Sequence, residues 1–271
     1  MNLRNKIAGA IYGFVIGDAM GATTEFMNHK EIKKKFGQVK DIIGGGWLNL
    51  QSGDVTDDTQ MTMCIMSAIM RQPQTVDEFK KYCIDNFVIW KNSKPKDIGN
   101  QCFVAINCLE CGSIIPIDNS ALGNGSLMRA MPLAVLNLPY FNIVQGRLTH
   151  NNEVCTRIIL DYTELIQNYI NNNYNNDLLR STETILEPSG YIVNTFNNSI
   201  YWSKKNSFEE AIIGAVNHGG DADTIAAITG SLAGAKFGYN KIPKRWINQL
   251  NPDVKEFLEK FINFVNTCLQ I

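Results

Sequence analysis

The sequence predicts an all-α protein. Apolar residues recur at helical spacing along most of the chain, and the alternation expected of a β-strand is almost absent. Residues 39–43 form the one weak candidate for a strand. At 271 residues the chain can bury a large core without disulfides or structural metals, so we expect one domain spanning residues 1–271.

The first predicted helix carries a stripe of glycines at positions 9, 13, 17 and 21. Residues four apart lie on one face of a helix, so this stripe lets another backbone come close. In lipid it would suggest helix dimerisation, but packing inside a globule explains this short segment better. Alanine and glycine also keep one face of a later predicted helix free of bulky side chains, from Ala226 to Gly234. We expect the two stripes to let the ends of these helices meet.

The second predicted helix begins at Asp54 or Thr56 and runs towards Met70, with Pro73 just beyond its end. Apolar periodicity predicts the remaining helices at Val76 to Trp90, Asn100 to Cys111, Glu153 to Tyr169, Gly190 to Trp202, Phe208 to Val216 and Val254 to Leu269. The Asn-rich segment from Asn168 to Asn176 is typical of a polar, mobile surface loop.

Composition excludes several classes of partner. The 25 basic and 26 acidic residues leave a net charge of −1, which cannot gather nucleic acid or an anionic membrane surface. The seven cysteines include one close pair, Cys108 and Cys111, without further zinc ligands nearby, so we expect reduced core thiols. The apolar stretch from Ile7 to Ile16 is shorter than the roughly 20 residues of a membrane span. We therefore expect a soluble, cytoplasmic monomer.

Two short acidic motifs are the strongest chemical signal. The first, Thr56-Asp57-Asp58-Thr59, could simply start a helix, with Asp54 or Thr56 as its cap and the acids near the positive end of its dipole. A similar pattern recurs in Asp221-Ala222-Asp223-Thr224, after two glycines. Glycines permit close backbone approach, which a helix cap does not require.

Together the motifs offer four carboxylates and two threonine hydroxyls, without cysteine or histidine. Oxygen-only ligands suit Mg²⁺ or Mn²⁺ better than zinc. If the four carboxylates converge, their repulsion would raise their pKa values unless cations neutralise them, and two divalent cations carry the matching charge. Convergence is a hypothesis at this point, because spacing alone does not show it.

Four segments, in this order, resemble the ADP-ribosylglycohydrolase family. They are Gly13 to Gly21 with Glu25 following, Thr56 to Thr59, Gly123 to Arg129, and Gly219 to Ala226. The resemblance implies a single compact orthogonal helical bundle with a dinuclear Mg²⁺ or Mn²⁺ centre in a cleft. It also implies metal ligands at Thr56, Asp57, Asp58, Asp221, Asp223 and Thr224.

The resemblance also suggests acids that take part in the reaction. Glu25 matches an acidic residue that reaches the metal centre or acts as acid or base in part of the family, although an exposed glutamate is the simple alternative. Asp97 resembles a residue beside the ribose, on a short match. Asp57 and Asp58 join Glu25 as candidates for proton transfer, with metal ligation as their main expected role.

Substrate contacts are expected from a glycine-rich loop and two histidines. Backbone N–H groups and the Ser126 hydroxyl suit a diphosphate, although such a loop is more often a plain turn. Arg129 could balance phosphate charge or pair with an acid in the core. Lone histidines are usually structural, and neither has a serine or cysteine nucleophile motif beside it. The expected binding residues are Asn124, Gly125, Ser126, His150, His218, Gly219 and Gly220.

The predicted reaction is metal-dependent hydrolysis of the bond between ADP-ribose and a protein side chain, with arginine as the first choice. The partners are then an ADP-ribosylated protein as substrate and ADP-ribose as product. Three alternatives remain open: a hydrolase of O-linked serine or small-molecule ADP-ribose conjugates, a non-catalytic ADP-ribose-binding protein, and a two-metal phosphatase or pyrophosphatase.

Overall fold

The computed structural model describes residues 2–173 and 183–270 and confirms the all-α class. Within these ranges the β-type contacts are isolated bridges, not strands. The strand considered at residues 39–43 is therefore wrong. The Asn217 side chain takes the place of a neighbouring strand there, because its amide accepts from Val39 N–H and donates to Val39 C=O, each at 2.8 Å.

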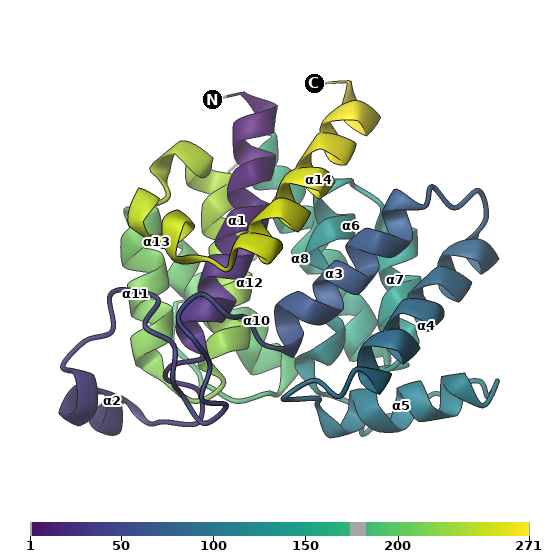
Figure 1. Cartoon of the computed structure of the whole chain (residues 1–271), viewed down its shortest axis with the longest axis horizontal. Helices are drawn as coiled ribbons and strands as arrows, with labels where there is room; N and C mark the ends of the chain where they lie inside the picture. Colours follow the sequence, from purple (N-terminus) through teal and green to yellow (C-terminus); the bar gives the residue numbers. More distant parts are fainter. Residues whose placement is uncertain (1, 174–182, 271) are drawn as a thin grey trace.

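The α-helices of the described ranges are arranged as Figure 1 shows. In the first half they are α1 (Leu3–Gly21), α2 (His29–Phe36), α3 (Asp57–Met70), α4 (Val76–Asn92), α5 (Asn100–Glu110), α6 (Met131–Val135) and α7 (Pro139–Arg147). In the second half they are α8 (Glu153–Ile170), α10 (Ile192–Ser203), α11 (Phe208–His218), α12 (Ala222–Phe237), α13 (Lys244–Gln249) and α14 (Pro252–Leu269). Two 3₁₀ turns are η1 (Asn124–Ser126) and η2 (Tyr239–Lys241).

Helix α1 runs through the middle of the molecule and packs along α12 (Figure 1). A Cβ atom at Gly13 would lie 2.1 Å from the Gly230 carbonyl oxygen, and one at Gly17 would lie 2.0 Å from that of Ala226. Real side chains cannot occupy such positions, so the small residues are needed for this backbone contact. The close packing predicted from the glycine stripe is confirmed.

The pairing between α1 and α12 is antiparallel. Gly9 faces Gly234 near one end, and Gly21 faces Ala222 at the other. The carboxyl end of α1 therefore meets the amino end of α12, although about two hundred residues separate them in the sequence. Glu25, four residues beyond Gly21, is thus held close to the second acidic motif.

The long helices lie within a few residues of their predicted ranges, whereas α2, α6, α7 and α13 were not predicted. The polar surface loop predicted at residues 168–176 is wrong for residues 168–170, which form the last turn of α8 and bury Tyr169 and Ile170 in the core; residues 171–173 are an exposed turn, and residues 174–176 lie outside the described residues. All seven cysteines are free thiols, of which Cys83, Cys102 and Cys155 are buried. Within residues 2–173 and 183–270, no helix is both long and apolar enough to cross a membrane.

Candidate active site

A cavity of about 250 Å³, here called the acidic cavity, lies where α1, α3 and α12 come together. It brings together residues that the sequence keeps far apart. Ten of the site residues predicted from the sequence line this cavity: Glu25, Asp57, Asp58, Asp97, Asn124, Gly125, His150, Asp221, Asp223 and Thr224. Both acidic motifs and the glycine-rich turn therefore face one space.

Two helix N-termini present the acidic motifs. Thr56 caps α3 by accepting a hydrogen bond from Asp58 N–H at 3.2 Å, and Asp221 stands at the N-cap position of α12. The positive ends of both helix dipoles therefore lie beside these carboxylates and stabilise their ionised form. The Thr224 hydroxyl joins the motifs, since it lies 3.5 Å from Asp58 Oδ1 and 3.3 Å from Asp221 Oδ1.

Asp18 holds the first turn of α3 in place through hydrogen bonds to its backbone. This carboxylate is fully buried in α1 and accepts from Thr56 N–H at 3.2 Å and from Thr59 N–H at 3.1 Å. It satisfies backbone donors that a helix start leaves free. Asp18 was not predicted as a site residue, although its place in the glycine-striped segment before Glu25 was a usable signal.

Glu25 is buried and receives one side-chain hydrogen bond, from Trp47 Nε1 to Glu25 Oε2 at 2.6 Å. Trp47 is half-exposed and also packs against Phe26, with 5.4 Å between ring centroids. The indole therefore covers Glu25 and holds one of its oxygens. Sequence reasoning missed Trp47, because it lies in a loop with no periodic pattern.

Burial raises the pKa values of the cavity acids, and repulsion between neighbours adds to the effect. The pKa of Glu25 rises to about 8, although the hydrogen bond from Trp47 opposes the shift. Burial, together with the charges of Asp97 and Asp18, raises the pKa of Asp57 to about 7. The pKa values of Asp58 and Asp223 also lie well above their usual range.

These acids fit a divalent cation. Ligand oxygens of Glu25, Asp221 and Asp223 lie within 4.8 Å of one another. Asp58 Oδ2 and Asp223 Oδ1 are buried without a hydrogen-bond partner. The ion pairs found in the described ranges involve none of the cavity carboxylates. Buried carboxylates without a cationic partner are costly, and a hard cation is the counter-charge that oxygen ligands prefer.

The opposite wall of the cavity is neutral and rigid. Arg129 is fully buried and donates to the Gly125 carbonyl at 2.8 Å and to Thr149 Oγ1 at 2.6 Å. These hydrogen bonds hold the glycine-rich turn η1 in place from the core side. Burial, together with the charge of Arg129, lowers the pKa of His150 to about 3, so its imidazole is neutral. Thr149 Oγ1 already accepts from Arg129, so its hydroxyl can donate to His150 Nδ1 at 2.8 Å and leave Nε2 protonated.

Five predicted residues lie outside the lining of the acidic cavity. Thr56 is buried at the α3 cap, and Ser126 is buried with its hydroxyl unpartnered. His218 packs against the Trp202 ring at 5.9 Å instead. The backbones of the last two, Gly219 and Gly220, pack against the segment that follows α1, where Gly220 N–H donates to Met27 C=O at 2.8 Å. Their predicted ligand and substrate roles stay predictions.

Comparison with known proteins agrees with this geometry. The model of the ADP-ribosylglycohydrolase family matches residues 1–187 and 161–269. The chain belongs to the ADP-ribosylglycohydrolase family. It is 31% identical over 284 residues to the ADP-ribosyl-[dinitrogen reductase] glycohydrolase of Rhodospirillum rubrum, with 97% of this chain and 96% of that protein covered.

Two further relatives support membership in the ADP-ribosylglycohydrolase family. The ADP-ribosylarginine hydrolase Tri1 of Pseudomonas putida is 27% identical, over 91% of this chain and 74% of that protein. A solved structure described as an ADP-ribosylglycohydrolase-related protein complex superposes with a TM-score of 0.80 and 25% identity, covering 97% of this chain and 99% of the other. The protein is thus a hydrolase of ADP-ribosyl glycosidic bonds, and its acidic cluster could bind metal.

Proposed function

We propose that this enzyme hydrolyses the N-glycosidic bond between ADP-ribose and an arginine side chain of a modified protein. The observation that carries the proposal is the acidic cavity, where six carboxylates face a glycine-rich turn and a neutral histidine. The names of the Rhodospirillum and Pseudomonas relatives support ADP-ribosyl-arginine over other linkages. In the reaction the C1–N bond of the ribose breaks, water supplies the oxygen on C1, and the arginine leaves with a proton.

We assign two divalent cations, Mg²⁺ or Mn²⁺, to the acidic cavity. Their ligands would come from Asp57, Asp58, Asp221, Asp223 and Thr224, with the buried Thr56 hydroxyl as the sixth predicted ligand. When bound, such cations neutralise the carboxylates and supply Lewis acidity towards the ribose. The neutral side of the cavity would bind the rest of ADP-ribose, with His150 Nε2–H and Gly125 N–H as donors, because Asn124 N–H already donates to the Gly190 carbonyl at 3.0 Å.

Proton transfer is assigned to Glu25. Trp47 donates to Oε2, which leaves Oε1 free to hold a proton. A carboxyl whose pKa is raised towards neutrality is suited to both giving and taking a proton at physiological pH. Asp97, on the other side of the cavity, is the second candidate because its pKa is also raised by burial.

The proposal extends to the whole chain. We propose that residues 1–271 form one ADP-ribosylglycohydrolase-like domain, because the acidic cavity is lined by residues from both halves of the chain, and that this domain acts as a monomer. The cytoplasmic location predicted from the sequence remains part of this proposal.

Defined ADP-ribosylated peptides test the function. With Mn²⁺ supplied, the enzyme should release intact ADP-ribose from an ADP-ribosyl-arginine peptide. Asp57→Ala and Asp223→Ala should each lose metal binding and at least about a hundredfold in turnover, because charged ligands are removed from the site. Asp77→Ala, which removes an exposed carboxylate from α4, is the matched control and should remain active.

Each alternative predicts a different product. Cleavage of only a serine-linked peptide would replace the arginine linkage, and release of phosphate or of a nucleoside monophosphate would indicate a phosphatase or pyrophosphatase. Tight ADP-ribose binding without any release would refute hydrolysis and favour a binding protein.

A further inference from the structure

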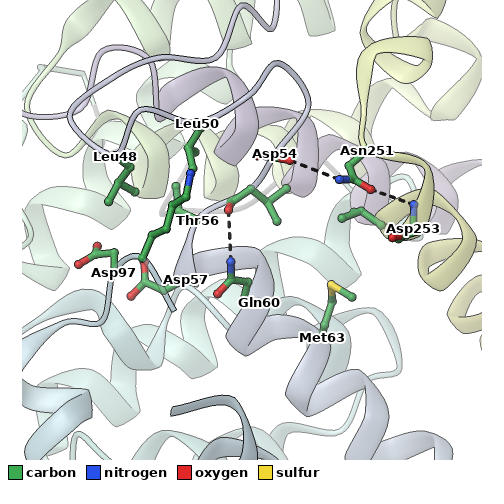
Figure 2. Close-up of a pocket in the computed structure, with 13 residues that line it drawn as sticks. Leu48, Leu50, Asp54, Thr56, Asp57, Gln60, Met63, Asp97, Asn251 and Asp253 are labelled. Atoms are coloured by element: carbon green, nitrogen blue, oxygen red, sulfur yellow. Dashed lines mark hydrogen bonds between the residues drawn. The ribbon is translucent and has the colours of Figure 1, made fainter. Parts of the chain in front are cut away.

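A second cavity, of about 360 Å³, adjoins the acidic cavity and is here called the side cavity. It lies between the loop around Leu50, the first turns of α3, and the start of α14 (Figure 2). Asp57 and Asp97 line both cavities, so these two carboxylates form the boundary between them. Its volume lies within the range of about 300–1,000 Å³ typical of small-molecule sites.

The middle of the side cavity is largely apolar. Leu50 and Val55 are buried in its wall, and Met63 on α3 and Val254 on α14 complete it. Gln60 also lines it, but its amide groups are engaged by the Val55 carbonyl and by Trp90. Such walls suit a chain of methylene groups, whose burial is favourable.

Both ends of the side cavity are acidic. Figure 2 shows Asp57 and Asp97 at one end, and Asp54 and Asp253 towards the other. Within residues 2–173 and 183–270, the groups that donate hydrogen bonds to Asp54 are neutral: Gln51 N–H at 3.2 Å and the Asn251 side-chain amide at 3.3 Å.

The side cavity also has one basic residue among its lining side chains, Lys96. Lys96 is exposed, and its ammonium group lies 3.4 Å from the Asn49 carbonyl oxygen. Even with Asp57 assigned to the divalent cations, three further carboxylates outnumber the one ammonium group, so the lining of the side cavity favours a cation.

We propose that the side cavity is the subsite for the arginine side chain that leaves during the reaction. This inference rests on the proposed function. A ribose held at the boundary carboxylates places its glycosidic nitrogen beside Asp57 and Asp97. The guanidinium group lies against these acids, and its methylene stem lies between Leu50 and Met63.

The two acids at the end of the side cavity away from Asp57 and Asp97 would contact substrate residues next to the modified arginine. Asp54 and Asp253 lie where the peptide around the modified arginine would leave the side cavity. Opposite charges across a contact favour the matching partner, so a basic residue beside the modified arginine should improve binding.

Agmatine tests the subsite directly, because it carries a guanidinium and an ammonium group at the two ends of a butyl chain. We expect agmatine to bind the Mn²⁺-loaded enzyme saturated with ADP-ribose, measured by calorimetry. Met63→Lys places an ammonium group in the wall and should weaken agmatine binding at least about tenfold, while ADP-ribose affinity stays within about twofold. Met63→Leu is the matched control and should bind agmatine as the wild type does.

Kinetics supply the second test. The double variant Asp54→Asn with Asp253→Asn should raise KM for an ADP-ribosyl-arginine peptide by about fivefold to tenfold with little change in kcat. Asp77→Asn should leave KM unchanged. Absence of agmatine binding to the wild type, or an equal KM in the double variant and this control, overturns the subsite.

The two proposals fail in different ways. If the wild type cleaves the arginine peptide but none of these variants changes KM or agmatine binding, the subsite is refuted and the proposed function stands. If agmatine binds and Met63→Lys abolishes the binding, but no ADP-ribosylated arginine is cleaved, the cation site stands and the proposed reaction fails.

Discussion

Glu25 and Trp47 are joined by a single hydrogen bond that can be removed without a large change in shape. Trp47→Phe keeps an aromatic ring beside Phe26 but deletes the N–H donor to Glu25. A hydrogen bond to a charged group contributes about 1.5–3 kcal/mol, and the half-exposed position favours the lower end. We expect turnover to fall about tenfold while the fold is retained, measured by steady-state kinetics and circular dichroism.

Tyr140→Phe is the control for this substitution, because it removes a polar group from an exposed aromatic residue of α7. It should leave turnover unchanged. Wild-type turnover in Trp47→Phe would show that the indole donor does not position Glu25.

The sequence predicted the acidic residues of the site better than the residues that hold these acids in position. Asp57 and Asp223 stand at helix starts, where local pattern is informative. Trp47 reaches Glu25 from a loop 22 residues away, and no periodicity encodes such a contact. His218 stands next to the second acidic motif in the sequence, but its ring packs on Trp202 and is not part of the cavity lining.

The contact between α1 and α12 gives a prediction at the scale of elements. A Cβ atom in Gly17→Ala would lie 2.0 Å from the Ala226 carbonyl oxygen, so the two backbones must separate. The gain in helix propensity, about 1 kcal/mol, offsets only part of the steric cost. We expect a net loss of about 2–4 kcal/mol in the free energy of unfolding, measured by urea denaturation.

Gly99→Ala is the control for Gly17→Ala, since its added Cβ would meet no atom within 4 Å. Gly99 is the N-cap residue of α5, where glycine is preferred to alanine, so this control should lower stability by about 1 kcal/mol or less. Gly17→Ala should also weaken Mn²⁺ binding, because Asp18 ties the α3 turn that carries Asp57 and Asp58 to α1, and this turn would move away from Asp221 and Asp223 with α1. An unchanged unfolding curve would contradict the close-contact interpretation.

Sequence reasoning succeeded with the long helices and failed with the short ones for a physical reason. A long helix shows several turns of apolar periodicity and often a cap, such as Thr56 for α3. Helices α6 and α13 have 5 and 6 residues, too few to show a period. The segment at residues 39–43 looked extended, but side chains take the place of a neighbouring strand: Asn217 pairs with the Val39 backbone, and Gln249 accepts from Ile42 N–H at 3.2 Å.

At the scale of the molecule, the active site depends on contacts between distant parts of the chain. The antiparallel pairing of α1 with α12 brings Glu25 to Asp221, and Asp18 attaches α3 to the same end. Helical periodicity predicted these elements but not their mutual placement. The two small-residue faces predicted that α1 and α12 would approach, whereas the position of Asp97 depends on a loop whose course has no local signal.

The cluster of acids also makes stability depend on pH in a predictable direction. The folded pKa values of Glu25, Asp57 and Asp221 are raised to about 8, 7 and 6. In the unfolded chain such groups titrate near 4, so between about pH 4 and pH 8 the folded protein binds more protons. Without metal, the free energy of unfolding should therefore be highest at the acidic end and fall as pH rises through this window.

Divalent cations should reverse this trend, because they bind the ionised carboxylates in competition with protons. Saturation at a hundred times the Kd adds about 2.7 kcal/mol, or roughly 5–10 °C in Tm for a chain of this size. Thermal unfolding with EDTA or Mn²⁺ should therefore show a Tm difference that is small at pH 5 and grows towards pH 8. Asp223→Asn should reduce both the pH dependence with EDTA and the gain with Mn²⁺, whereas Asp77→Asn should change neither. A Mn²⁺ gain that is equal at pH 5 and pH 8 would contradict the cavity acids as its ligands.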